Sequence, residues 1–112
     1  MLLSSLEANK SYAGLEKKPE RSITRLQAIR ISLGKMQVPF ADEMGYNPRK
    51  YYRFEQSPDD VPVALLARLH EKHRVNINWF LYGTGFPIDG DDQSDPNGHG
   101  NVILALMDYR PQ

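Results

Sequence analysis

Apolar side chains recur every three or four residues through the central part of the chain, which is the spacing of an α-helix. A first run carries Ile23, Leu26, Ile29 and Leu33, and a later run carries Val63, Leu66 and Leu69. Between residues 22 and 86 no run alternates apolar and polar positions as a half-buried strand does. The pattern therefore predicts an all-α fold for residues 22–86.

Capping residues divide this region into five short helices. Polar residues that favour helix starts alternate along it with residues that favour helix ends. The expected starts are at Ser22, Gln37, Asn47, Asp60 and Asn76, and the helices are expected to end before Gly34, Gly45, Pro58, Arg74 and Gly83. Because the connections are short, the five helices are expected to form one compact unit.

Two flanking segments differ in composition from the helical region. Residues 1–21 mix polar residues with scattered leucines and contain Lys17-Lys18-Pro19, so a flexible N-terminal arm is expected. Residues 87–101 read PIDGDDQSDPNGHGN, which is the composition of an acidic linker with few contacts to the rest of the chain. The C-terminal tail, residues 87–112, also contains the apolar segment 102–107, which is too short to form a stable element alone. This segment is expected to pack on another surface, for example that of a second subunit.

The composition of the chain excludes several classes of protein. With 112 residues there is room for one small domain, and without cysteine there is no disulfide framework, thiolate metal site or cysteine nucleophile. The first residues lack an export signal, and no run of 18 apolar residues is long enough to span a bilayer. A cytoplasmic protein that does not contact a membrane is expected.

The net charge of zero conceals an asymmetry. Residues 1–55 carry ten Lys and Arg against six Asp and Glu, whereas residues 56–112 carry four against eight. Such a division favours a basic face on one half of the molecule. Ordinary solvated surface charge is the alternative interpretation.

Three of the ten basic residues of the first half lie on the third predicted helix, residues 48–56. Tyr51 and Phe54 are expected to point inward. This leaves the outer faces to Arg49, Lys50, Tyr52 and Arg53. The preceding connection is short enough to force a sharp angle between two helices, as in a helix-turn-helix. Arg49 and Arg53 lie one turn apart, so both guanidinium groups can reach guanine O6 and N7 in a DNA major groove.

The order and spacing of these elements resemble the Cro/repressor-like (XRE) helix-turn-helix family of phage repressors and bacterial transcriptional regulators. The resemblance covers residues 23–85 and implies a lambda-repressor-like DNA-binding domain within residues 22–86. Its matching pieces are Arg25-Leu26, Arg30, Gln37, Ala41, Gly45, Phe54-Glu55 and the segment 76–81 with Gly83 and Gly85.

The resemblance also implies roles for individual side chains. The positions implied to contact DNA bases are Pro48, Arg49 and Arg53, and those implied to contact phosphates are Gln37, Asn47, Lys50 and Tyr52. Pro48 offers only apolar contact, so specificity is expected to rest on the two arginines, which favour G·C pairs. Asn47 is equally well interpreted as a plain helix cap.

An ion pair is expected between Arg30 and Glu55. Arg30 follows Leu26 by four residues at the edge of an apolar stripe, and Glu55 stands beside the inward-facing Phe54. A charge beside a core needs a partner, and the resemblance pairs these two positions. Tyr51 stands where the family prefers an aliphatic residue, so its hydroxyl is expected to need a partner or an opening to solvent.

Two other features depart from the family pattern. Many relatives place basic residues after the third helix, whereas this chain has Ser57-Pro58-Asp59-Asp60, whose carboxylates would repel phosphate. His70 and His73 stand where the family has apolar core residues, at a spacing that can bind a metal or sense pH. Because the pattern offers no third ligand, packed or partly exposed histidines and no metal are expected.

These observations lead to two functional hypotheses. The first is a sequence-specific transcriptional regulator, a dimeric repressor that binds palindromic double-stranded DNA through residues 48–56 as a homodimer. The alternative is a protein-interaction module, antitoxin-like or an adaptor protein, that binds another polypeptide through its helical domain or C-terminal segment. Neither an enzyme nor a cofactor is expected, because no catalytic triad or phosphate-binding glycine loop is apparent.

Overall fold

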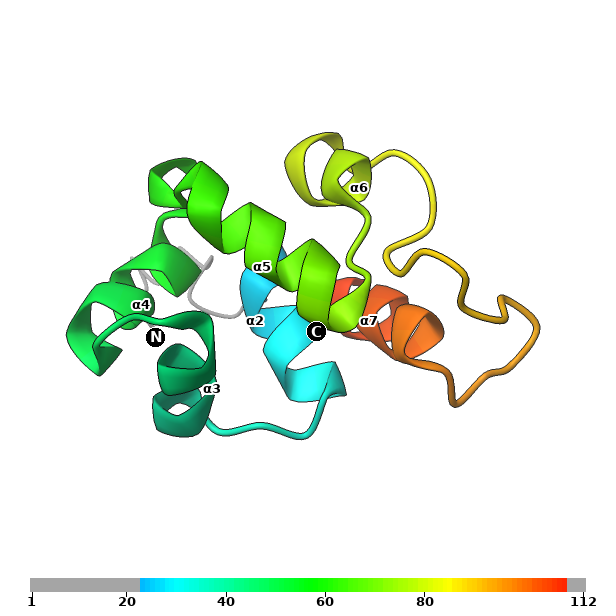
Figure 1. Ribbon diagram of the computed structural model, residues 1–112. Helices are drawn as coiled ribbons and strands as arrows, with labels where there is room; N and C mark the ends of the chain where they lie inside the picture. The colour runs from blue at the N-terminus through cyan, green and yellow to red at the C-terminus, as the bar shows by residue number, and fades with distance from the viewer. Residues whose placement is uncertain (1–22, 109–112) are drawn as a thin grey trace, which may run out of the picture.

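The computed structural model describes residues 23–108, which form a set of short helices (Figure 1). In chain order these are α2 (Arg25–Ser32), α3 (Gln37–Met44), α4 (Pro48–Gln56), the 3₁₀ helix η2 (Pro58–Asp60), α5 (Val63–His73), α6 (Ile77–Tyr82) and α7 (His99–Met107). Within residues 23–108 the β structure is limited to an isolated antiparallel bridge between Val75 and Ile88. The all-α prediction is confirmed. None of the described helices is long and apolar enough to cross a membrane.

Local capping explains where most of the helices begin and end. Asn47 and Asn76 cap α4 and α6 with their side chains, and Gly45 and Gly83 end α3 and α6 in the left-handed region, at φ of +88° and +79°. These four boundaries agree with the sequence-based expectation. Glycine tolerates this conformation because it has no Cβ.

Two predicted helix starts were wrong. The cap of α2 is Thr24, whose Oγ1 accepts a hydrogen bond from the N–H of Gln27 at 3.3 Å, whereas Ser22 lies outside the described residues. Asp60 belongs to η2, and α5 begins after Pro62. Pro58 and Pro62 both lack the N–H that a continuous helix requires, so the chain makes a 3₁₀ turn between them.

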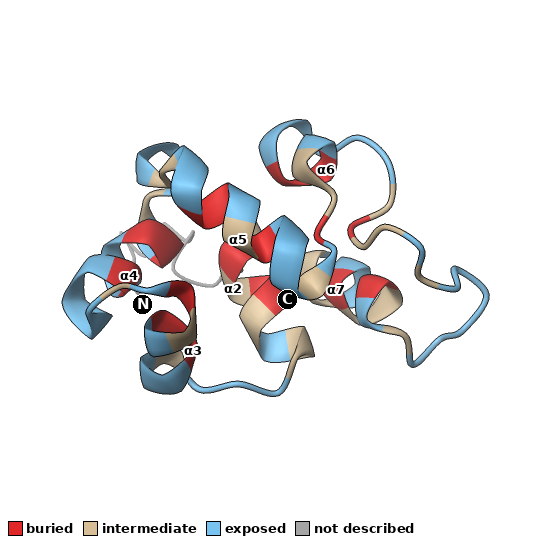
Figure 2. Cartoon of the chain, viewed as in Figure 1, coloured by how far each residue is buried: buried red, intermediate tan, exposed pale blue. Residues whose placement is uncertain are grey.

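The helices share one hydrophobic core, which Figure 2 shows as buried positions on their facing sides. Its largest fully buried side chains are Tyr51, Phe40, Leu26, Ile29, Met44, Leu65, Leu69, Ile103, Val75 and Pro87. The stripe predicted for α5 was partly wrong, since Val63 is 79% exposed and Leu65 is buried in its place. Val63 is the first residue of α5, at the end of the helix that extends past the core.

The C-terminal region packs against the rest of the chain. Helix α7 lies along α2, with Ile103 fully buried (Figure 1). The N–H of Asn76 donates to the Pro87 carbonyl at 2.7 Å, and Asp91 Oδ2 accepts the N–H of Gly100 at 2.8 Å. The expectation that residues 87–101 form few contacts was therefore wrong, because backbone and aspartate hydrogen bonds order the segment and α7 supplies apolar burial. The N-terminal arm predicted at residues 1–21 lies outside the described residues.

Candidate nucleic-acid interface

Helices α3 and α4 are joined by a tight turn of the three residues 45–47. The N–H groups of Gly45 and Tyr46 close the end of α3 by donating to the carbonyls of Asp42 and Ala41, at 3.0 and 2.9 Å. Asn47 Oδ1 then accepts the N–H of Lys50 at 2.9 Å, which starts α4 at once. Two short helices consequently meet at a sharp angle, with α4 on the outside of the molecule (Figure 1).

The outward side of α4 carries the side chains that the sequence predicted to contact DNA. Pro48, Arg49, Lys50, Tyr52 and Arg53 are all exposed, while the opposite side of the helix is buried (Figure 2). Among residues 23–108, none of the three cations of this set is held in an ion pair. The three positive charges are thus free to meet an external anion.

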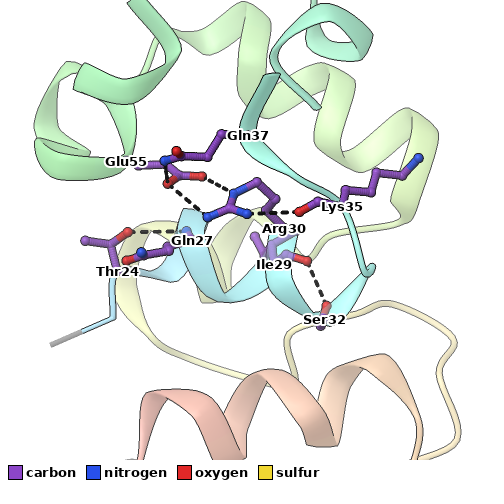
Figure 3. Close-up of polar contacts among 8 residues, drawn as sticks. All are labelled: Thr24, Gln27, Ile29, Arg30, Ser32, Lys35, Gln37 and Glu55. Atoms are coloured by element: carbon purple, nitrogen blue, oxygen red, sulfur yellow. Dashed lines mark hydrogen bonds and ion pairs between the residues drawn. The ribbon is translucent and has the colours of Figure 1, made fainter. Parts of the chain in front are cut away.

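A buried carboxylate anchors the C-terminal end of α4, and the ion pair expected from the sequence is present (Figure 3). Arg30 Nε donates to Glu55 Oε2 at 2.6 Å, with the two side chains only 11% and 3% exposed. Arg30 Nη1 also donates to the carbonyl of Lys35 at 2.9 Å. The guanidinium therefore joins α2, the loop before α3 and α4.

Gln37 completes this network in a way that the sequence did not reveal. Its Nε2 donates to Glu55 Oε1 at 2.9 Å, so the side chain lies over the ion pair (Figure 3). One amide N–H that was expected to face a phosphate is thus occupied by Glu55, and the phosphate contact of Gln37 stays a prediction. The bond links the first residue of α3 to the penultimate residue of α4.

Tyr51 lies fully buried beneath the outward side of α4. Its ring packs edge-on against Phe40, with centroids 5.8 Å apart. Burial raises the pKa of the Tyr51 hydroxyl above its ordinary value, and the carboxylate of Glu55 acts in the same direction. The hydroxyl oxygen makes no hydrogen bond within the described residues, so the expected partner or opening to solvent is missing.

The two histidines of α5 are packed or partly exposed, as expected. His73 Nε2 lies 2.7 Å from Glu43 Oε2, and Lys35 Nζ lies 3.2 Å from Glu43 Oε1. Burial raises the pKa of Glu43, but the hydrogen bonds from His73 and Lys35 outweigh this effect and the pKa is lowered. His70 is exposed, with Nδ1 3.1 Å from the Val75 carbonyl. Residues 23–108 contain no group of three or more acidic or histidine side chains that could hold a metal ion.

Two carboxylates follow α4 directly. Asp59 and Asp60 are exposed on η2, which begins two residues after α4 ends. Like charge disfavours a phosphate at this position. The N-terminal half of α4 is therefore the part of the helix to which a polyanion has the most favourable access.

Two arginines position the helices, and neither was singled out for this from the sequence. Arg68 of α5 donates from Nη1 to the carbonyl of Met44 at 2.6 Å. Arg25 of α2 donates from Nη1 to the carbonyl of Phe80 at 3.0 Å. The sequence signal for Arg68 was weak: a cation between the buried Leu66 and Leu69.

An apolar hollow of about 460 Å³ lies beside α7. Its walls are Ile23, Pro96, Asn101, Val102, Ala105 and Leu106. Hollows lined by apolar side chains suit another polypeptide better than a polyanion.

Comparison of the chain with models of known protein families, with curated proteins and with solved structures finds no match. The family resemblance of the sequence motifs accordingly stays a prediction.

Proposed function

We propose that this protein is a sequence-specific DNA-binding regulator of the Cro/repressor-like (XRE) type, a dimeric repressor that inserts α4 into the major groove. The observation that carries the proposal is the outward side of α4, where Arg49, Lys50 and Arg53 are exposed and unpaired within the described chain. The opposite side of the same helix is anchored by the buried Tyr51 and Phe54.

The chemistry of these side chains suits a groove of DNA. An α-helix fits the major groove, and an arginine binds O6 and N7 of guanine through two parallel hydrogen bonds. Arg49 and Arg53 lie one helical turn apart, so both can face the floor of the groove. Lys50 is placed to contact a phosphate at the groove wall, and Asn47 and Tyr52 flank the same surface.

A single helix-turn-helix contacts only about half of a typical operator. Useful affinity comes from two copies related by a two-fold axis, with recognition helices about 34 Å apart. A homodimer that reads an inverted repeat is therefore part of the proposal.

The experiment starts with selection of bound fragments from random duplex DNA by the full chain. We expect enrichment of an inverted repeat with G·C pairs in each half-site. Arg49→Ala and Arg53→Ala should each weaken binding to that site by about 1–3 kcal/mol and leave binding to random DNA nearly unchanged. Equal losses on selected and random DNA would contradict a base-reading role.

Lys50→Ala tests the phosphate contact. Its loss should lower affinity for all sequences and reduce the salt dependence by about one unit per contact. Lys72→Ala is the matched control, because Lys72 is an exposed cation on α5 rather than α4. If Lys72→Ala lowers affinity as much as Lys50→Ala, the effect is general charge rather than a contact from α4.

The second candidate function is a protein-interaction module, which the apolar hollow beside α7 favours. This alternative predicts that no DNA sequence is enriched. It also predicts that Ala105→Glu, which places a charge in the hollow, abolishes capture of the protein partner.

A further inference from the structure

We propose that Arg68 is a positioning residue for α4: it holds the turn between α3 and α4 and so sets the angle at which Arg49 and Arg53 are presented. This inference rests on the proposed function, since it assigns to Arg68 a role in sequence discrimination without contact with DNA.

The first observation is the hydrogen bond that Arg68 makes to the end of α3. Its Nη1 donates to the carbonyl of Met44, the last residue of α3, at 2.6 Å. The last carbonyls of a helix have no partner inside the helix, and a cation there also interacts favourably with the helix dipole. Arg68 thus ties α5 to the point where α3 stops.

The second observation is the cation–π contact between the same guanidinium and Tyr46, a residue of the turn itself. The guanidinium carbon of Arg68 lies 5.6 Å from the centre of the Tyr46 ring. The Tyr46 ring in turn packs edge-on against Phe54 of α4, with centroids 5.1 Å apart. A continuous line of contacts therefore runs from α5 through the turn to the buried side of α4.

The third observation is the space that Gly45 leaves for the guanidinium. A Cβ built on Gly45 would lie 3.0 Å from Arg68 Nη1, closer than carbon and nitrogen normally pack. Gly45 is needed both for its φ of +88° and for the approach of Arg68.

Only an arginine satisfies these requirements together. Its planar guanidinium presents donors in a fork and stacks on an aromatic face, whereas the ammonium of lysine is a compact point charge. Lysine at position 68 retains the charge and can reach one carbonyl, but it lacks the planar guanidinium that lies over the Tyr46 ring.

The test compares Arg68→Met and Arg68→Lys with Lys72→Met, which removes an exposed cation from the same helix. For each protein we measure affinity for the selected inverted repeat and for random DNA, the salt dependence, and the hydrogen exchange of the amides at 45–47. Arg68→Met should reduce the ratio of specific to random affinity by about tenfold, which corresponds to about 1.4 kcal/mol. Its salt dependence should be unchanged, and its turn amides should exchange faster.

Arg68→Lys should recover only part of the specific affinity, and Lys72→Met should behave like the wild type. If Arg68→Met does not fold, Tyr46→Leu removes the ring that joins Arg68 to Phe54 while keeping the hydrogen bond to Met44, and it should lower the same ratio. Full recovery with lysine, or an equal loss on both DNAs with a weaker salt dependence, would show that Arg68 acts through its charge and would overturn the proposal. A wild-type protein that discriminates no sequence would overturn the proposed function as well, and is recognised before any variant is made.

Discussion

Tyr51 is the least favourably placed polar side chain of the described core. Its ring is fully buried and packs well, but its hydroxyl oxygen finds no hydrogen-bond partner within residues 23–108. A buried hydroxyl that loses its water without gaining a partner costs roughly 1–3 kcal/mol. The ring, rather than the hydroxyl, is what position 51 contributes to stability.

Tyr51→Phe should consequently raise the free energy of unfolding by about 1 kcal/mol, because it removes the unpaired hydroxyl and keeps the contact with Phe40. Urea unfolding monitored by circular dichroism measures the change. Tyr52→Phe is the control, since Tyr52 is exposed and its hydroxyl is not confined to the core. A loss of stability in Tyr51→Phe would mean that the hydroxyl is hydrogen-bonded, with the Glu55 carboxylate, which raises its pKa, as the acceptor.

Helices α2, α3 and α4 are held together by polar groups as well as by apolar packing. Glu55 receives hydrogen bonds from Arg30 and Gln37, and both its oxygens are used. A buried charge that loses its partner is more costly than a pair removed together. The network therefore behaves as a unit.

Arg30→Met and Glu55→Gln should each lower the free energy of unfolding by about 3–5 kcal/mol, because the remaining group is left near the core. The double variant should cost less than the two single changes added. A double-mutant cycle in urea measures this coupling. Additive losses would mean that the two groups do not stabilise the fold as a pair.

The contact between Glu43 of α3 and His73 of α5 makes the stability of the fold decrease at acid pH. The pKa of Glu43 is lower in the folded chain than its ordinary value of 4.5, because the hydrogen bonds from His73 and Lys35 outweigh burial. The stabilisation that this contact contributes is fully present above the pKa of Glu43 in the unfolded chain. It is lost as the pH falls through the pKa of Glu43 in the folded chain. Glu43→Gln should flatten the decline in unfolding midpoint between about pH 5 and 3. Asp42→Asn, which changes the exposed neighbouring acid, should leave the decline in place.

Helix α7 belongs to the same domain as the helices that precede it. The chain that follows α6 returns to the domain, and His99 Nδ1 lies 3.0 Å from the Ser32 carbonyl at the far end of α2. The six α-helices of residues 23–108 thus share one core, which the buried Ile103 helps to fill. The C-terminal helix packs on its own chain.

Ile103→Ala should lower the free energy of unfolding by about 2–5 kcal/mol, because it leaves a cavity between α7 and α2. Its neighbour Leu104 is 39% exposed, so Leu104→Ala should cost clearly less. Deletion of residues 99–112 should lower the thermal midpoint further, because it uncovers the apolar side of α2. A truncated chain as stable as the whole protein would show that α7 contributes nothing to the core.

Signals that act within a few residues were readable from the sequence. The asparagine caps, the glycines that end helices (Gly34, Gly45 and Gly83) and the inward positions of Tyr51 and Phe54 depend on the nearest turn of the chain, and each was predicted correctly. The Arg30–Glu55 pair was also predictable, because both charges border an apolar stripe and the family resemblance pairs the two positions. The outward display of Arg49, Lys50 and Arg53 followed from the same helical periodicity.

Apart from the Arg30–Glu55 pair, contacts between distant parts of the chain were decided only by the tertiary structure. Nothing in the composition of residues 87–101 indicated that Asp91 would cap α7 or that α7 would cover α2. Likewise, the bond from Arg68 to Met44 joins residues 24 apart in the sequence, and that from Gln37 to Glu55 joins residues 18 apart. Such contacts depend on how the helices pack in three dimensions, and helical periodicity carries no information about which helices become neighbours.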